Sequence, residues 1–377
     1  MTSLRAEAES LAKLISETSD DFGPAVSAFY QKLGGGLPAS TLNEAAAVLF
    51  EYATRLCPVE REVNFYLITG GLIELGADPE IGWDHLHSRL RRCLTVLARD
   101  ADQLQKTGVD LDAGEPNADF EPELRGWVRI FRHLVIAAMA RLARRPELRL
   151  QARHIDRGFA RSAWQLEQEL PSTHGYYLSE VLNVLDDKVL LVDAISQKME
   201  LFQVQAVRNC GHLIALLEGA DARRLGSTPR ANYEIRNHYA SFGCIDEESA
   251  GLFKRKMKLK DADWMFMLGV ELSAQNIPTL HVPGLGPLRI VVRAPKRVGS
   301  RSFLAADFFA PIHDALIEAI VPVRSFSAEE RAAMSTSIVE AARALRQNLG
   351  RTNGAAPFAP GQMHDPAWIS HWSSSAR

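Results

Sequence analysis

The sequence predicts an α+β fold: an irregular N-terminal α-helical bundle, then a smaller α+β domain with a mostly antiparallel sheet. Apolar residues recur at helical spacing through the first half of the chain, whereas the second half contains short β-branched runs between turn residues. The composition, 46% hydrophobic and 24% charged, is that of an ordinary globular protein. A closing helix and an extended C-terminal tail complete the predicted architecture.

The helical half divides into three predicted parts. An acidic helical region covers 1–106, an acidic linker covers 107–121, and two long helices within 122–174 complete the bundle. In the first part, Asp78-Pro79 is typical of a helix cap followed by a first-turn proline and predicts a helix over 79–106. Near the end of the bundle, Pro146 separates two predicted helices, since proline cannot continue a helix interior.

The α+β domain is predicted over 175–328. The segment 186–207 contains two β-prone runs around a polar ISQK and indicates a hairpin; the alternative is one long helix from Tyr176 to Glu218. Further strands are predicted in DWMFMLGVEL, PTLHVPG, PLRIVVRAP and IVPVRSF, with a turn at Pro283-Gly284. A closing helix over 329–350, capped by Ser327, leads into a tail over 351–377.

Charge is spread unevenly along the chain. Residues 1–120 hold 19 acidic against 10 basic side chains, a net charge of −9, although the whole chain carries only −3. This balance argues against a nucleic-acid role for the whole protein.

The cysteines and the apolar runs indicate where the protein acts. The cysteines are scattered and form no CxxC pair, as expected for reduced thiols. The apolar run LVIAAM (134–139) is too short to cross a bilayer, and the polar N-terminus is no secretory signal. We therefore expect a cytoplasmic protein with no membrane partner.

No catalytic or cofactor motif stands out. The weak catalytic candidates are Glu271, His281 and Cys244, and the acids that follow Cys244 oppose thiolate formation. The acidic linker matches an EF-hand loop at Asp110, Asp112 and Glu121, but Gly114 and Glu115 occupy positions that require other residues. We therefore expect no metal site and no cofactor.

Basic residues form two candidate interaction segments. Arg149, Arg153, Arg157 and Arg161 recur every four residues and predict a ridge along one helix. This ridge could bind phosphates or an acidic partner, dock on the acidic region of the same chain, or face solvent. A weaker nucleic-acid candidate comprises 254–260 and 293–301, with few aromatic residues for base stacking. Its basic residues include Lys254, Arg255, Lys256, Lys258, Lys296 and Arg297.

The tail combines Gly, Ala, Pro and Ser with four large apolar side chains, Phe358, Met363, Trp368 and Trp372. It could cover the chain's own bundle, dock on another subunit with its tryptophans as anchors, or stay disordered. A protein partner or a homo-oligomer is therefore expected.

The leading functional hypothesis is a non-catalytic adaptor, accessory or scaffold subunit of a bacterial multiprotein assembly, with a conflict or defence system as one setting. The first alternative is an enzyme of unrecognised class with its site in the α+β domain. The second alternative is a nucleic-acid-binding protein that uses the two basic segments.

Overall fold

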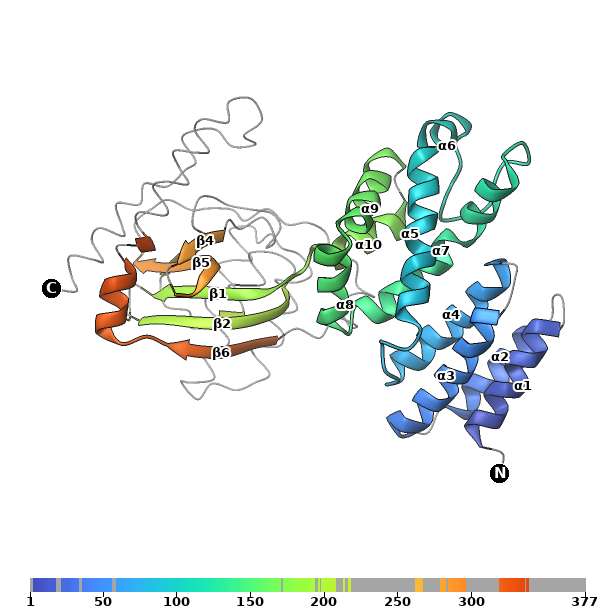
Figure 1. Cartoon of the computed structure of the whole chain (residues 1–377), viewed down its shortest axis with the longest axis horizontal. Coiled ribbons are helices and arrows are strands. Elements are labelled where there is room, and N and C mark those ends of the chain that lie inside the picture. Colours follow the sequence, from blue (N-terminus) through green and yellow to red (C-terminus); the bar gives the residue numbers. More distant parts are fainter. Residues whose placement is uncertain are drawn as a thin grey trace, which may run out of the picture. The chain divides into compact units, whose positions relative to one another are not determined.

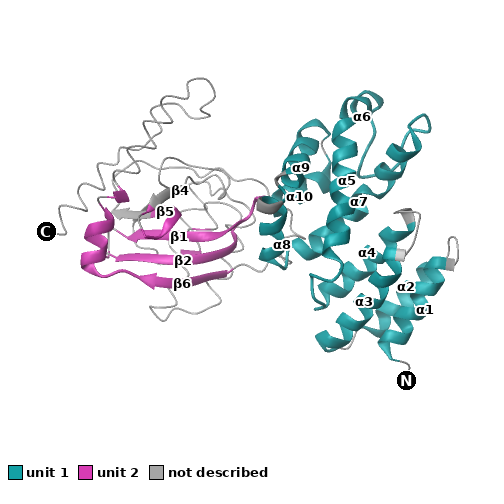
Figure 2. Cartoon of the chain, viewed as in Figure 1, with its two compact units in different colours: residues 1–182, 314–316 teal, residues 183–313, 317–377 magenta. Residues whose placement is uncertain are grey.

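A computed structural model gives the fold of the chain, which has an α+β architecture (Figure 1). It describes residues 3–17, 22–33, 36–55, 59–170, 172–193, 196, 198–207, 213, 216–217, 262–266, 279–282, 284–295, 319–335 and 337–338. Two compact units divide the chain (Figure 2). Unit 1 comprises 1–182 with 314–316, and unit 2 comprises 183–313 with 317–377. The finer domain boundaries expected from the sequence stay predictions.

Unit 1 is an irregular helical bundle, as predicted. In the described part of unit 1, α4 packs against α3 and α7, while α5 packs against α7 and α9. The long helix α7 supplies much of the core, because Trp127, Phe131 and Leu134 are all buried. The elements are α1 (Leu4–Glu17), α2 (Gly23–Lys32), α3 (Ala39–Arg55), α4 (Val59–Glu74), α5 (Trp83–Arg99), α6 (Ala101–Thr107), α7 (Pro122–Leu142), α8 (Pro146–Leu150), the π-helix η1 (Gln151–Ile155), α9 (Arg157–Glu169) and α10 (Thr173–Asn183).

The helix predicted over 79–106 is shorter and broken in the structure. It starts only at Trp83, because Gly82 before it adopts φ +73°. A side chain at Gly82 would overlap the ring of Phe50, so this position needs glycine for packing as well as for its backbone conformation. The break at Asp100 then separates α5 from α6.

The second predicted long helix, which follows Pro146, is also interrupted. The structure confirms that a helix starts at Pro146, but α8 gives way to η1 and the chain leaves helical geometry at Asp156. The Asp156 side chain then accepts a hydrogen bond from Phe159 N (3.1 Å) and caps α9. The prediction of one continuous helix was therefore wrong.

Unit 2 contains a mostly antiparallel sheet with strand order β3-β5-β1-β2-β6; β4 also pairs with β5. Only the β1–β5 pairing is parallel among the described strands. The edge strand β6 contains Pro322, and an edge tolerates the missing N–H. The strands are β1 (Leu185–Asp193), β2 (Lys198–Val207), β3 (Ala262–Phe266), β4 (Thr279–Val282), β5 (Gly286–Pro295) and β6 (Ala319–Ser325).

The hairpin predicted in 186–207 is confirmed, so the alternative of one long helix was wrong. β1 and β2 pair antiparallel, with Val189 opposite Phe202, and both residues belong to the buried cluster of this unit.

The closing helix starts as predicted: Glu330 N donates to Ser327 Oγ (3.2 Å), and the Glu330 carboxylate accepts from Ser327 N (2.8 Å). This reciprocal capping box defines the start of the helix.

Candidate interaction surface

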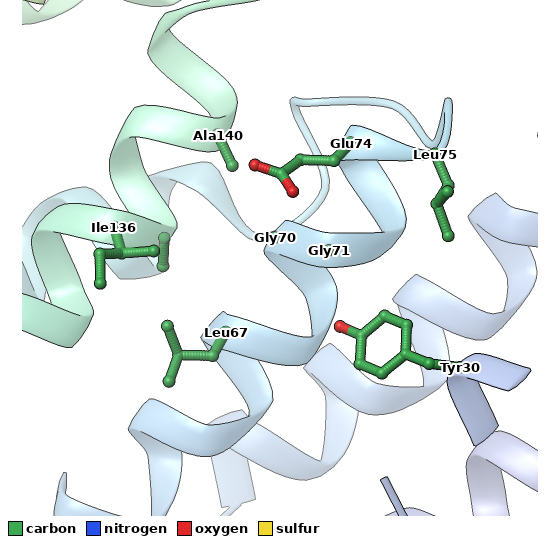
Figure 3. Close-up of a pocket in the computed structure, with 9 residues that line it drawn as sticks. Tyr30, Leu67, Gly70, Gly71, Glu74, Leu75, Ile136 and Ala140 are labelled. Carbon is green, nitrogen blue, oxygen red and sulfur yellow. The ribbon is translucent and has the colours of Figure 1, made fainter. Parts of the chain in front are cut away.

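A groove of about 420 Å³ lies along α4, between α2 and α7 (Figure 3). Its lining residues from α4 recur at spacings of three and four, so they share one helical face. Tyr30 of α2 lies on one side and the α7 residues on the other. The lining residues are Tyr30, Leu67, Gly70, Gly71, Glu74, Leu75, Ile136, Ala137 and Ala140. We call this surface the α4 groove.

The floor of the α4 groove is backbone, because two glycines lie at its centre. A Cβ on Gly70 would lie 3.6 Å from Cβ of Ala140, in ordinary contact with α7. A Cβ on Gly71 would overlap the hydroxyl of Tyr30 and lie 2.8 Å from its Cζ. Gly71 is therefore required for the close approach of Tyr30, whose hydroxyl covers this glycine.

The rim of the groove exposes large apolar side chains. Leu75 is 51% exposed and Ile136 is 44% exposed. Among the described residues, the other large apolar side chains this exposed are Trp164, Val321 and Val323, none of which lines the groove. Single exposed apolar residues are common on protein surfaces, but these two border the same cavity.

The polar groups of the groove are few. The Tyr30 hydroxyl already donates to Ile68 O (3.0 Å), and burial, with a contribution from Glu74, raises the pKa of Tyr30 to about 12. Glu74 is exposed. Burial lowers the pKa of Arg144, which the charge of Glu74 partly offsets. The lining of the groove therefore combines apolar side chains with the Tyr30 hydroxyl and the Glu74 carboxyl group.

Sequence reasoning did not identify this groove. The pair Gly70-Gly71 inside an apolar helical run was the available signal, since two glycines in a helix interior are costly without a packing reason. The contribution of Ile136 could not be found that way, because its exposure depends on how α7 packs against α4.

The structure does not arrange the four predicted arginines as one ridge, because the helix is broken at Asp156. Arg149 is fully buried and donates to the carbonyl oxygens of Leu142 and Ala143 near the end of α7. Its assignment as a surface contact is therefore wrong. Arg153 is half-buried and donates to Arg149 O (3.3 Å), whereas Arg161 is exposed on α9. Arg157 is the first residue of α9.

Most other predicted site residues lie outside the described part of the chain. Only residues 293–295 of the second basic segment are described, at the end of β5; the first basic segment and the tail lie outside the described residues. His281 lies in β4, opposite Pro287 of β5. The predicted residues outside the described ranges are Cys244, Glu271, Lys254, Arg255, Lys256, Lys258, Lys296, Arg297, Phe358, Met363, Trp368 and Trp372.

A buried polar cluster ties α4 to α5. Glu62 is fully buried, and its carboxylate accepts from Arg89 Nη2 (2.9 Å) and from the Tyr66 hydroxyl (3.4 Å). Burial and the nearby charge of Glu62 raise the pKa of Tyr66 above its usual range. His85 lies 3.8 Å from the same carboxylate. Because the charge is neutralised within the bundle, we assign this cluster to stability.

A second polar contact anchors the 108–121 loop to the start of α10. The Asp112 carboxylate accepts from Thr173 N (2.6 Å) and His174 N (3.2 Å) and lies 2.6 Å from His174 Nδ1. Burial opposes ionisation of Asp112, but these hydrogen bonds outweigh it and hold its pKa below the usual value. Asp112, which matched an EF-hand position in the sequence, therefore caps a helix.

Glu180 of α10 is the carboxyl group with the largest upward shift among the described residues. Burial, and then the like charge of Glu167 on α9, raise the pKa of Glu180 to about 7. Two carboxyl groups alone do not define a site, and no group of three metal-ligating side chains occurs in the described ranges.

Within the described ranges, no helix has the length and apolar character needed to span a membrane.

Comparisons of the chain with family models, with curated proteins and with solved structures found no match. The function proposed below therefore depends on the surface and its chemistry.

Proposed function

We propose that the protein is a non-catalytic interaction subunit of a multiprotein assembly in the cytoplasm, and that unit 1 binds a partner protein through the α4 groove. The observation that carries the proposal is the exposed apolar rim of Leu75 and Ile136 around a cavity floored by glycine. Apolar surface of this kind gains free energy when a partner removes it from water. The buried Glu62 is paired with Arg89 within the bundle, which supports a structural role for this pair.

Two exposed substitutions test the proposal. The double variant Leu75→Asp, Ile136→Asp places charge in the rim without removing a buried side chain, so the bundle should still fold. The matched control is Val323→Asp, which changes an apolar residue of similar exposure (51%) on β6. The full-length wild-type protein and both variants are purified from the native source with their bound proteins, which mass spectrometry identifies.

We expect a stoichiometric partner with the wild-type protein and with Val323→Asp, and its loss with the groove variant. The same set of bound proteins in all three preparations would contradict the proposal. Circular dichroism of each preparation shows whether the bundle remains folded.

The tail is the second surface of this proposal. Its support is the sequence alone: Phe358, Met363, Trp368 and Trp372 are aromatic and apolar anchors of the kind that dominate protein contacts. Deletion of 352–377 should release a partner or dissociate an oligomer. If the truncated protein keeps every partner and its oligomeric state, the tail has no part in assembly. The groove variants then remain as the test of the proposed function.

A further inference from the structure

A single aromatic side chain closes the α2 side of the α4 groove. The Tyr30 ring reaches from α2 to α4 (Figure 3), where its hydroxyl donates to Ile68 O (3.0 Å). A Cβ on Gly71 would lie 2.1 Å from the Tyr30 oxygen and 2.8 and 2.9 Å from Cζ and Cε1 of its ring. Tyr30 therefore covers the backbone of α4 at Gly71, and it can do so only because residue 71 has no side chain.

The contact of Tyr30 with α4 can break without damage to α4. Ile68 lies inside α4, which continues to Glu74, so its carbonyl oxygen has a helical partner besides Tyr30. Burial, with a contribution from Glu74, raises the pKa of Tyr30 to about 12, so the hydroxyl keeps the proton that it donates at neutral pH. When Tyr30 leaves, α4 therefore keeps its own hydrogen bonds.

The helix that carries Tyr30 has little buried surface of its own. Of the ten residues of α2, all of them described, Phe29 alone is buried, whereas α5 buries seven. α2 packs against α1, where Lys32 Nζ lies 2.9 Å from the Glu7 carboxylate, but the Lys32 side chain is exposed and such a pair contributes little. Elements with few buried apolar contacts open at a lower free energy than the rest of a bundle.

We propose that α2 is a lid on the α4 groove and that Tyr30 holds it closed; this inference rests on the proposed function. In the closed state, Tyr30 occupies the surface above Gly71 and forms one side of the groove. When α2 moves away, the groove extends along α4 over Gly71 while the other helices stay packed. A partner of the extended groove competes with Tyr30, so its apparent affinity falls with the fraction of molecules that are open.

Hydrogen exchange of the full-length protein tests the lid. Two variants weaken its closure: Tyr30→Phe removes the hydroxyl, and Gly71→Ala displaces the ring. Gly70→Ala is the matched control, because its Cβ would lie 3.6 Å from Ala140 Cβ, in ordinary contact, with no Tyr30 atom within 4 Å. Mass spectrometry follows peptides from α2 and, as an internal reference, peptides from α4 and α7.

We expect exchange of α2 to be about two- to tenfold faster in Tyr30→Phe, the range for loss of one hydrogen bond, and at least about tenfold faster in Gly71→Ala. Gly70→Ala should leave the exchange of α2 unchanged, and α4 and α7 should stay protected in every variant. If α2 exchanges at the wild-type rate in both lid variants, or only in step with α4 and α7, α2 is a fixed part of the bundle and the inference is wrong.

The affinity of the co-purified partner tests whether the lid regulates the groove. Tyr30→Phe should bind this partner more tightly than wild type, by about the factor by which its α2 exchange accelerates, because both depend on the open fraction. An unchanged affinity would overturn the inference, since α2 would then open without controlling the groove. The proposed function fails on a different result, which is retention of the partner by Leu75→Asp, Ile136→Asp.

Discussion

Glu180 makes the stability of unit 1 depend on pH in a way that one substitution removes. Burial and Glu167 raise the pKa of Glu180 from 4.5 to about 7 in the folded protein. Because the pKa of this carboxyl is higher in the folded state than in the unfolded state, its ionisation destabilises the folded protein. Its penalty is therefore absent below the unfolded pKa, grows above it, and is complete once the pH exceeds the folded pKa.

The magnitude follows from the two pKa values. One pKa unit corresponds to about 1.4 kcal/mol, so this shift costs about 3 kcal/mol at alkaline pH. Between pH 5 and pH 8 the change is about 2 kcal/mol once the partial exposure of Glu180 is allowed for. Glu180→Gln keeps the shape of the side chain and removes its titration. The free energy of unfolding of the variant, relative to wild type, should therefore rise by about 2 kcal/mol between pH 5 and pH 8.

Urea unfolding followed by far-ultraviolet circular dichroism measures the difference at each pH. The control Glu167→Gln should reduce the pH dependence of the wild-type protein without abolishing it, because burial is the larger cause of the shift. If the difference in free energy of unfolding between wild type and Glu180→Gln is the same at pH 5 and pH 8, the carboxyl is not perturbed and the reasoning fails.

Three further substitutions test contacts within unit 1. Arg89→Met should lower the free energy of unfolding by about 2–3 kcal/mol in urea titrations, because Glu62 stays buried without its cation; adding Glu62→Gln should recover part of the loss. Asp112→Asn should cost about 1–2 kcal/mol near neutral pH, and calorimetry should show this difference vanishing as the pH falls through the depressed folded pKa of Asp112. Gly71→Ala should destabilise by about 1–3 kcal/mol, and a double-mutant cycle should show a smaller cost in a Tyr30→Ala background, because the overlapping ring is gone.

Local sequence pattern was sufficient to predict the elements of this fold but not where its helices break. The hairpin over 186–207 was predictable, because two β-prone runs flank a short polar segment. The start of α8 and the cap of the closing helix were also predictable, since Pro146 and Ser327 act on their own backbone.

Tertiary contacts decided the features that the sequence did not predict. The break before α9 accompanies a buried Arg149 whose partners are carbonyl oxygens of α7, so no pattern within the segment reveals it. The late start of α5 depends on the ring of Phe50 beside Gly82. The α4 groove was missed for the same reason: the exposure of Ile136 is set by the packing of α7 on α4.

Site-specific photo-crosslinking tests the central claim most directly. A photoreactive phenylalanine analogue replaces Ile136 in the α4 groove or, as the control, Trp164 on α9, and the full-length protein is irradiated with its co-purified partner. We expect a covalent adduct from position 136 that maps to one surface of the partner, and none from position 164. Adducts from position 164 alone, or equal adducts from both positions, would contradict the assignment of the α4 groove as the interaction surface.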